Sequence, residues 1–354
     1  MLAMSEQTPA NAADPQELDH LFMILGGHIY FQTLSAAVRF DLFGLLKREG
    51  ELTRSEIAEQ LGIEEQPARI LLLGCTTLKL ICKAGSHYSN TDLANRYLVR
   101  DEPNSMVPIA LWQHFINYRP MSHFYDAIKA NQNVGLDEFE GQGDTLYQRL
   151  AHSPRLEKIF QDAMESISVQ ANVLLAEHVD FAGVTHLLDV GGGNSANIQT
   201  LANKYPDLRA TVFDSPSVCQ IALKSIEAAG MSDRLNAVTG DCFRDAFPTD
   251  ADCILFSHFF TIWSEENNRM LLEKSYAALP PGGRVIVFNM MQWDDENGPL
   301  SAAWGSPYFL TLATGEGMLY TAGDYEQWLR DAGFTSVSRQ TLPVDHAAII
   351  GVKG

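Results

Sequence analysis

The sequence is short of positive charge. Its 354 residues include 25 Lys and Arg against 44 Asp and Glu, which gives a formal net charge of −19. Nucleic-acid binding needs a basic face, so this balance argues against a nucleic-acid partner. A hydrophobic content of 46% and a charged content of 19% are instead typical of a soluble globular protein with an acid-rich surface.

Long apolar runs are also missing, and so are cysteines at the spacing of metal ligands. No run reaches the roughly 18 apolar residues of a membrane-spanning helix, so we expect no membrane partner. The N-terminus is polar and acidic through Asp19, which predicts no secretory signal and a disordered tail over residues 1–15. We expect free thiols, no metal site and a cytoplasmic location, since the cysteines are only Cys75, Cys82, Cys219, Cys242 and Cys253.

What the sequence does contain is a strand followed by a glycine turn. Residues 187–190 are apolar apart from Asp189, a pattern typical of a buried parallel strand. Three glycines follow, from Gly191 to Gly193, and residues 198–203 then predict a helix. Glycine lets backbone approach a ligand because no Cβ intervenes, and the helix start adds free N–H groups. Since Ala196 also suits the last position of a dinucleotide fingerprint, the glycines alone do not exclude NAD.

Further apolar runs follow, and polar residues end them. Residues 210–214 end in Asp214, about 20 residues past the glycine turn, a spacing that suits hydrogen bonding to ribose hydroxyls. Residues 235–241 predict a third strand ending in Gly-Asp, residues 251–257 a fourth, and residues 280–288 a turn followed by a fifth. The sequence therefore predicts an α/β fold built on a Rossmann-like sheet.

The first hundred residues predict a winged helix. Thr53 and Glu56 form a capping-box pattern, residues 53–61 and 66–78 predict two helices, and residues 80–90 predict a β wing. Winged helices can bind DNA, but the second helix here opens on two glutamates, a poor match for phosphates. We therefore interpret this part as a structural or dimerising module.

The order of these motifs resembles class I S-adenosylmethionine (SAM) methyltransferases, and the full length resembles the plant-type O-methyltransferase family. The resemblance implies a winged-helix dimerisation domain over residues 16–105, a helical linker and substrate roof over 106–178, and a SAM-binding domain over 179–354. It implies SAM as cofactor with S-adenosylhomocysteine as product, no metal and a small-molecule methyl acceptor. It also implies a homodimer whose partner subunit helps to close the active site.

The resemblance also implies nine SAM-contacting positions, which are Asp189, Gly191, Gly193, Asp214, Asp241, Phe243, Ser257, Phe160 and Met164. The glycine turn and Asp189 would hold the methionine end, and Asp214 would hold the ribose. Asp241 would hydrogen-bond the adenine, and Phe243 would stack on it. The two residues of the linker helix match positions near the methyl group.

The sequence departs from this family at the catalytic base. O-methylating members carry His-Asp-Trp after the fourth strand, with the His as general base and two Glu that orient it. Here residues 261–263 are Thr-Ile-Trp, so Thr261 occupies the base position. Asn289 stands at the first Glu position. Leu319 stands at the second by a looser alignment, and Glu316 lies close by.

The missing base favours an acceptor that has no proton to lose. An oxygen acceptor sheds a proton on methylation, whereas a thioether sulfur does not and needs only positioning and electrostatics. We therefore predict S-methylation of the thioether of a small 2-hydroxy acid. The segment 21–32 and the missing base are similar to bacterial enzymes that methylate 4-methylthio-2-hydroxybutyrate on the way to dimethylsulfoniopropionate.

Other interpretations remain open. An activated carbon acceptor would tolerate the loss of the base, as would a member that no longer methylates. An O-methyltransferase of a small aromatic metabolite would use His258 as a displaced base, or Thr261 in a reduced role. A non-catalytic regulator that senses SAM is the alternative outside enzymes.

Candidate acceptor-binding residues lie mainly on aromatic-rich segments. A carboxylate on the acceptor would need a cation, for which Arg119, His123 and His114 are candidates, with Asn289 as a further polar contact. A sulfonium favours aromatic faces, and those available are Trp112, Tyr125, Tyr147, Trp304 and Tyr308. Trp304 and Tyr308 are four residues apart, which predicts that they share one helix face.

Overall fold

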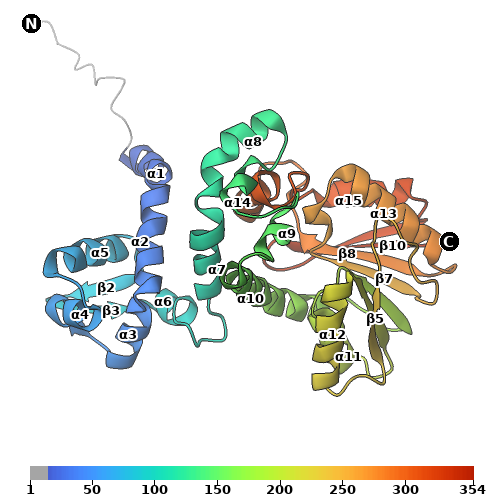
Figure 1. Cartoon of the computed structure of the whole chain (residues 1–354), viewed down its shortest axis with the longest axis horizontal. Helices are drawn as coiled ribbons and strands as arrows, with labels where there is room; N and C mark the ends of the chain where they lie inside the picture. The colour runs from blue at the N-terminus through green and yellow to red at the C-terminus, as the bar shows by residue number, and fades with distance from the viewer. Residues whose placement is uncertain (1–14) are drawn as a thin grey trace, which may run out of the picture. The chain divides into compact units, whose positions relative to one another are not determined.

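A computed structural model describes residues 15–354 of the chain (Figure 1). These residues form two compact units, one ending at His114 and one running from Phe115 to Gly354. The predicted linker, residues 106–178, is divided between them. The predicted tail lies outside the described residues except for Pro15, the first residue of α1.

The N-terminal unit is a winged helix preceded by two further helices. Its small sheet is antiparallel with the order β1-β3-β2, and Gly85 makes the wing turn at a φ of +59°. Thr53 caps α4 in a capping box with Glu56, as predicted. The elements are α1 (Pro15–Leu25), α2 (Gly27–Arg39), α3 (Leu42–Glu49), β1 (Leu52–Thr53), α4 (Arg54–Leu61), α5 (Glu65–Thr77), β2 (Ile81–Ala84), β3 (His87–Asn90), α6 (Asp92–Tyr97) and α7 (Val107–Trp112).

This unit has a buried core and an exposed apolar surface. Phe43, Leu72 and Ile81 are buried at its centre. By contrast, α1 and the start of α2 expose a set of large apolar side chains, the α1 apolar face, made of Leu18, Leu21, Phe22, Met23, Ile24, Leu25 and Ile29. Within residues 15–354 no single helix is long and apolar enough to cross a membrane, although α1 and α2 pass that test as a pair bent by 65°.

The C-terminal unit begins with a helical segment. The segment ends in a 25-residue helix, α10, whose first residue is Pro154; proline suits this position because its N–H would have no partner there. Its elements are η1 (Gln113–Asn117), which starts in the other unit, η2 (Pro120–His123), α8 (Phe124–Ala130), η3 (Val134–Glu138), α9 (Leu146–Leu150) and α10 (Pro154–His178).

A seven-stranded sheet follows, with the order β6-β5-β4-β7-β8-β10-β9. The first five strands along this order are parallel, and β10 runs antiparallel to both of its neighbours. The strands are β4 (His186–Val190), β5 (Arg209–Asp214), β6 (Leu235–Thr239), β7 (Cys253–Ser257), β8 (Arg284–Met290), β9 (Ser336–Thr341) and β10 (His346–Val352).

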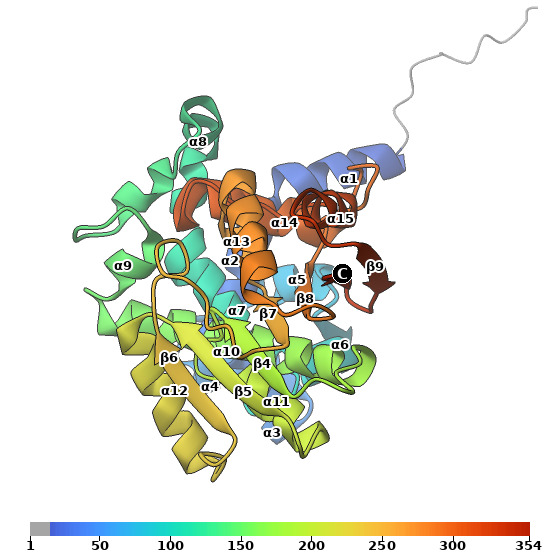
Figure 2. The same ribbon diagram turned by 90° about the vertical axis from the view of Figure 1, so that its right-hand side faces the viewer.

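Helices cover both faces of the sheet (Figures 1 and 2). Alternate strand residues point to opposite faces, so Leu188 and Ile254 join one core and Leu187 and Cys253 the other. The first core includes α13 and α15, and the second includes α10, α11 and α12. These elements are α11 (Ala196–Lys204), α12 (Pro216–Ala228), η4 (Phe260–Ile262), α13 (Glu265–Ala278), α14 (Leu300–Tyr308), η5 (Phe309–Ala313) and α15 (Ala322–Asp331).

The strand order places a switch point at β4. The chain moves from β4 to β5 on one side, and β7 later pairs on the other side. In open α/β sheets, ligands bind beyond the carboxyl ends of the strands at such a point. The turn after β4 and the loop after β7 therefore frame the candidate site. All five cysteines are free thiols, as predicted.

Candidate active site

The glycine turn after β4 adopts a conformation that requires glycine. Gly191 and Gly193 have φ values of +72° and +58°, a region that side chains with a Cβ rarely occupy. A Cβ on Gly191 would lie 2.2 Å from the Phe259 ring, whereas a Cβ on Gly193 would meet nothing within 4 Å. The turn is therefore packed against protein on one side and borders open space on the other.

Asp189 is a buried carboxylate with a spare oxygen. The residue has 0% exposure; its Oδ2 accepts a hydrogen bond from Asn197 Nδ2 at 3.3 Å, and its Oδ1 has no partner among the described residues. Burial raises the pKa of Asp189 to about 7, with a smaller contribution from the charge of Asp214. A buried carboxylate of this kind fits a cationic group that would pair with the free oxygen.

Asp214 ends β5 beside the glycine turn. Its Oδ2 accepts a hydrogen bond from the Gly193 N–H at 3.2 Å, and its Oδ1 accepts one from the Ser215 N–H at 2.7 Å. Burial raises the pKa of Asp214, and these hydrogen bonds act in the opposite direction. The carboxylate is thus held next to the turn, where it can accept hydrogen bonds from vicinal hydroxyls.

The loop after β6 lies at the same edge of the sheet. Asp241 Oδ1 accepts a hydrogen bond from the Phe243 N–H at 2.9 Å, and the Phe243 ring packs edge-on against Trp263 at 4.7 Å. A Cβ on Gly240 would lie 2.1 Å from Phe213, so β5 and this loop need glycine to meet. Burial raises the pKa of the neighbouring Cys242 thiol to about 12, so this thiol is a poor nucleophile at neutral pH.

The three positions that differ from the O-methylating pattern are all buried and neutral. Thr261 lies in η4, Asn289 in β8 and Leu319 in the segment before α15. Asn289 Nδ2 donates to the Tyr325 hydroxyl at 3.4 Å, and Asn289 Oδ1 has no partner among the described residues. None of the three side chains can accept a proton at neutral pH.

His258, the displaced base of one alternative, is held by sheet neighbours. Its backbone N–H donates to the Phe288 carbonyl at 2.8 Å, and its ring packs edge-on against the Phe288 ring. Its ring Nε2 lies 3.3 Å from His346 Nε2. Desolvation and His346 lower the pKa of His258 to about 3. An imidazole with so low a pKa is a weak base at neutral pH, so the geometry does not favour His258 as general base.

An aromatic and apolar group faces the linker helix. Phe160 and Met164 are half-buried on α10, and the Tyr147 ring packs edge-on against Phe160 at 5.8 Å. The hydroxyls of Tyr147 and Tyr308 interact, and burial raises both pKa values, that of Tyr147 to about 12. Both phenols therefore stay neutral and can donate a hydrogen bond to an acceptor molecule.

Comparison with known proteins identifies the family. Residues 122–335 match the O-methyltransferase domain, and residues 22–100 match the O-methyltransferase dimerisation domain. The chain belongs to the O-methyltransferase family.

Similar proteins extend over nearly the whole chain. An L-tyrosine C(3)-methyltransferase of Streptomyces lavendulae is 36% identical over 98% of this chain and 95% of its own length. A 3-hydroxy-5-methyl-1-naphthoate 3-O-methyltransferase of Streptomyces sahachiroi is 34% identical over 91% of each chain.

Among solved structures, the SAM-dependent methyltransferase SibL in its apo form is 39% identical, covers 95% of this chain and 99% of its own, and has a TM-score of 0.84. Human N-acetylserotonin methyltransferase in complex with SAM is 25% identical and has a TM-score of 0.83. The match covers 97% of this chain and 99% of the human chain. The protein is a SAM-dependent methyltransferase.

The residues of this O-methyltransferase family member fit SAM. The unpartnered Oδ1 of Asp189 suits the ammonium group of SAM, and the open side of Gly193 leaves room for the methionine end. Asp214 lies where ribose hydroxyls would need an acceptor, and Asp241 and Phe243 lie at the next strand end. Ser257 ends β7 at the same edge. The nine individual SAM contacts stay predictions. Among residues 15–354 no group of three or more His, Cys, Asp or Glu side chains could hold a metal ion.

Three of the predicted acceptor contacts have the following surroundings. His114 and Trp112 belong to the N-terminal unit, where Trp112 is buried and His114 Nε2 lies 3.3 Å from Arg39 Nη1. Tyr125 is 71% exposed on α8.

Trp304 and Tyr308 lie four residues apart in α14, as the predicted shared helix requires. Their exposure differs, since Trp304 is 52% exposed whereas Tyr308 is 8% exposed. The shared face stays a prediction.

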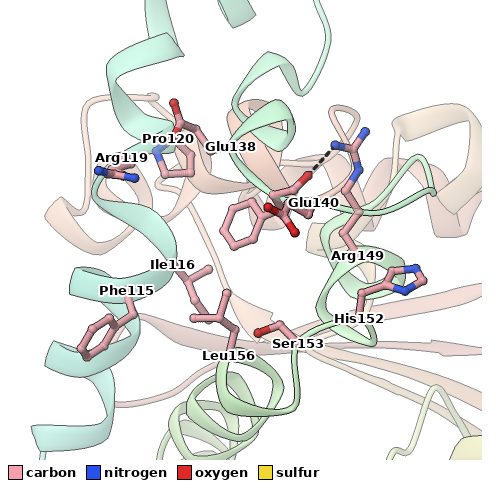
Figure 3. A pocket seen from close by; sticks show the side chains of 11 residues that line it. Phe115, Ile116, Arg119, Pro120, Glu138, Glu140, Arg149, His152, Ser153 and Leu156 are labelled. Carbon is pink, nitrogen blue, oxygen red and sulfur yellow. Dashed lines mark hydrogen bonds between the residues drawn. The ribbon is translucent and has the colours of Figure 1, made fainter.

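Two of the predicted cationic contacts lie together beside a cavity. Arg119 lines a cavity of about 370 Å³ in the C-terminal unit (Figure 3), and His123 Nε2 lies 3.1 Å from Glu138 Oε1 in its wall. The cavity also includes Glu140, His152 and Ser153, which the sequence analysis did not identify. These residues come from short segments between elements and carry no recognisable spacing.

Proposed function

We propose that this methyltransferase transfers a methyl group to a ring carbon of a small phenolic compound. The observation that carries the proposal is the replacement of the base and of both its orienting carboxylates by the buried neutral residues Thr261, Asn289 and Leu319. The two curated relatives described above are named for aromatic compounds, and one of them is named as a C-methyltransferase. Carbon methylation reconciles an aromatic acceptor with the missing base.

The chemistry explains why a ring carbon tolerates this site. SAM supplies a methyl group made electrophilic by its sulfonium. The phenolic oxygen donates electrons into the ring, so that an ortho carbon forms the new C–C bond as the C–S bond breaks. The ring then releases its proton to water and regains aromaticity. A base is not needed to create the nucleophile, whereas positioning of the ring is essential.

The side chains around Phe160 suit such positioning. Phe160 and Met164 offer apolar surface, and the neutral Tyr147 and Tyr308 offer hydroxyl donors for the phenolic oxygen of the acceptor. A hydrogen bond that occupies this oxygen leaves the neighbouring carbon as the reactive atom.

The thioether acceptor shares the base-free argument, but the curated relatives are named for aromatic acceptors. It is therefore the main rival of this proposal. O-methylation is the second rival, and it would require a base that the described residues do not place at the expected positions.

The deciding experiment identifies the atom that receives the methyl group. Methyl-¹³C SAM is incubated separately with L-tyrosine, catechol and 4-methylthio-2-hydroxybutyrate, and the products are examined by NMR. We expect a ring-bound methyl group on L-tyrosine. A product methylated only on oxygen, or only on the thioether sulfur, would contradict the proposal and identify the corresponding rival.

His258→Gln separates carbon methylation from base-dependent transfer. Because the pKa of His258 is about 3, the imidazole is already neutral at pH 7, and we expect kcat to change less than about threefold. The profile of kcat against pH should show no acid limb near pH 6.5 in either protein. A loss of about a hundredfold or more would make His258 the base and favour O-methylation.

We also propose that the protein is a homodimer formed through the N-terminal unit. The match to the dimerisation domain and the exposed α1 apolar face support this proposal. Light scattering should give twice the chain mass of 39.2 kDa, and the double variant Phe22→Asp/Ile24→Asp should give one chain mass. Asp19→Asn on the same helix is the control and should stay dimeric. A monomeric wild-type protein at micromolar concentration would refute the proposal.

A further inference from the structure

The cavity beside Arg119 has a lining of mixed charge. It holds about 370 Å³ within the C-terminal unit, between the start of α10 and the segment that joins η3 to α9 (Figure 3). Its walls contain both acidic and basic side chains together with apolar ones, and the polar members are Arg119, Glu138, Glu140, Arg149, His152 and Ser153.

Two of the charged side chains, those of Arg149 and Glu138, bind other groups of the protein. Arg149 donates from Nη1 to the carbonyls of Leu136 and Phe139, each at 3.0 Å, and from Nε to that of Gly143 at 3.0 Å. Glu138 is paired with His123. These bonds hold the loop in place and leave Arg149 and Glu138 less available to a ligand.

Other polar groups remain available for a ligand. Figure 3 shows the Glu140 carboxylate and the Ser153 hydroxyl turned toward the middle of the cavity, with Arg119 and His152 at opposite sides. Arg119 also borders an outer hollow that it shares with Tyr118 and Ser122, so it lies at the mouth. A carboxylate inside and a guanidinium at the mouth match a ligand that carries an ammonium and a carboxylate group close together.

The cavity borders the start of α10, the helix that also carries the residues near the predicted methyl position. Leu156, Phe160 and Met164 follow one another at four-residue intervals and so lie along one side of the helix. Leu156 lines the cavity, and Phe160 lies one turn further, a rise of about 6 Å. One helical turn is the length scale of the side arm that joins an aromatic ring to an amino-acid group.

We propose that this cavity binds the ammonium and carboxylate groups of the acceptor, which makes the acceptor an aromatic α-amino acid with a phenolic ring. Glu140 pairs with the ammonium group, Arg119 pairs with the carboxylate, and the ring lies beside Phe160 and Tyr147. This inference rests on the proposed function and names the substrate class for the same site.

The first test compares four phenols that differ only in their charged groups. They are L-tyrosine, tyramine, 3-(4-hydroxyphenyl)propionate and 4-ethylphenol. We expect kcat/KM to fall about tenfold or more for each charged group removed. Equal values for 4-ethylphenol and L-tyrosine would overturn the inference while leaving carbon methylation intact.

The second test uses charge-removing variants against the same compounds. Glu140→Gln should raise KM about tenfold for L-tyrosine and tyramine and leave the propionate unaffected. Arg119→Gln should raise KM for L-tyrosine and the propionate and leave tyramine unaffected. Glu177→Gln and Arg209→Gln, at exposed sites away from the cavity, are the matched controls. A merely structural effect would weaken all four compounds equally and would overturn the assignment.

Binding separates the two proposals. Calorimetric titration of L-tyrosine into the protein bound to S-adenosylhomocysteine measures the affinity for L-tyrosine without any turnover. If no phenol is methylated but L-tyrosine binds and Glu140→Gln weakens that binding about tenfold, the proposed function fails, and the assignment of the cavity to the charged groups of an amino acid is retained. If L-tyrosine does not bind, or if neither variant changes its affinity, the inference fails.

Discussion

Replacement of Asp189 by Asn is expected to abolish SAM binding and, at the same time, to stabilise the protein that has no SAM. The Oδ1 of Asp189 is buried without a partner, and loss of the charge that pairs with a ligand ammonium leaves that ammonium uncompensated. Breaking a buried ion pair costs about 3 kcal/mol or more, which predicts at least a hundredfold loss of affinity. Calorimetry with SAM measures this loss.

The stability half of this prediction follows from the raised pKa. The folded-state pKa of Asp189 is about 7 against a reference of 3.8, so the folded protein without SAM holds a proton that the unfolded chain releases. Its contribution to stability is fully present below about pH 4 and is lost as the pH rises through 7. The melting temperature of Asp189→Asn should therefore exceed that of the wild type at pH 8 and approach it at pH 5.

The same linkage applies to binding. SAM needs the ionised carboxylate, so its affinity for the wild type should decline as the pH falls below 7. The control is Asp207→Asn, an exposed acid, which should change neither affinity nor melting temperature. Full SAM affinity in Asp189→Asn would refute the role of this carboxylate.

Two glycine-to-alanine substitutions in the turn after β4 should destabilise the protein to different extents. Gly191→Ala places a Cβ 2.2 Å from the Phe259 ring at a φ of +72°, and we expect a loss of about 2–4 kcal/mol of unfolding free energy from the clash and the backbone strain. Gly193→Ala meets nothing within 4 Å and carries only the strain at a φ of +58°, a cost of about 1 kcal/mol.

SAM binding completes this comparison. The Cβ of Gly193→Ala projects into the open space that the methionine end of SAM would occupy, so this variant should stay folded and lose affinity about tenfold or more. Chemical denaturation and calorimetry measure the two quantities separately. Equal stability losses in both variants would show that the Phe259 contact has no energetic importance, and unchanged SAM affinity in Gly193→Ala would remove Gly193 from the site.

The sheet and the turn could be predicted from the sequence because they depend on local patterns. Strand β4 combines an apolar run with an immediate glycine turn, and Thr53 and Glu56 stand three residues apart at the start of α4. Each pattern specifies one element through its own neighbours. The strand ends then meet at one edge because parallel strands share their direction.

The acceptor side could not be predicted in the same way. The state of His258 depends on His346, which is 88 residues away in sequence and contacts it only once β10 pairs with β8. Trp304 and Tyr308 are four residues apart in α14, but Trp304 is exposed and Tyr308 is buried. Glu140 and Ser153 come together through the path of the loop between η3 and α10, for which no local pattern exists.

The length of α10 has a consequence for how such a protein can diverge. Its first three turns carry Leu156, Phe160 and Met164, while its last turns bury Ala171 and Leu175 in the core beneath the sheet. The two halves of α10 therefore differ: the C-terminal half is packed into the core, and the N-terminal half carries the residues near the proposed acceptor site. Substitutions in the N-terminal half can retune acceptor choice without disturbing the nucleotide fold. A single residue inserted between the two halves would rotate the N-terminal half by about 100° relative to the C-terminal half. Leu156, Phe160 and Met164 would then no longer face the same side as before.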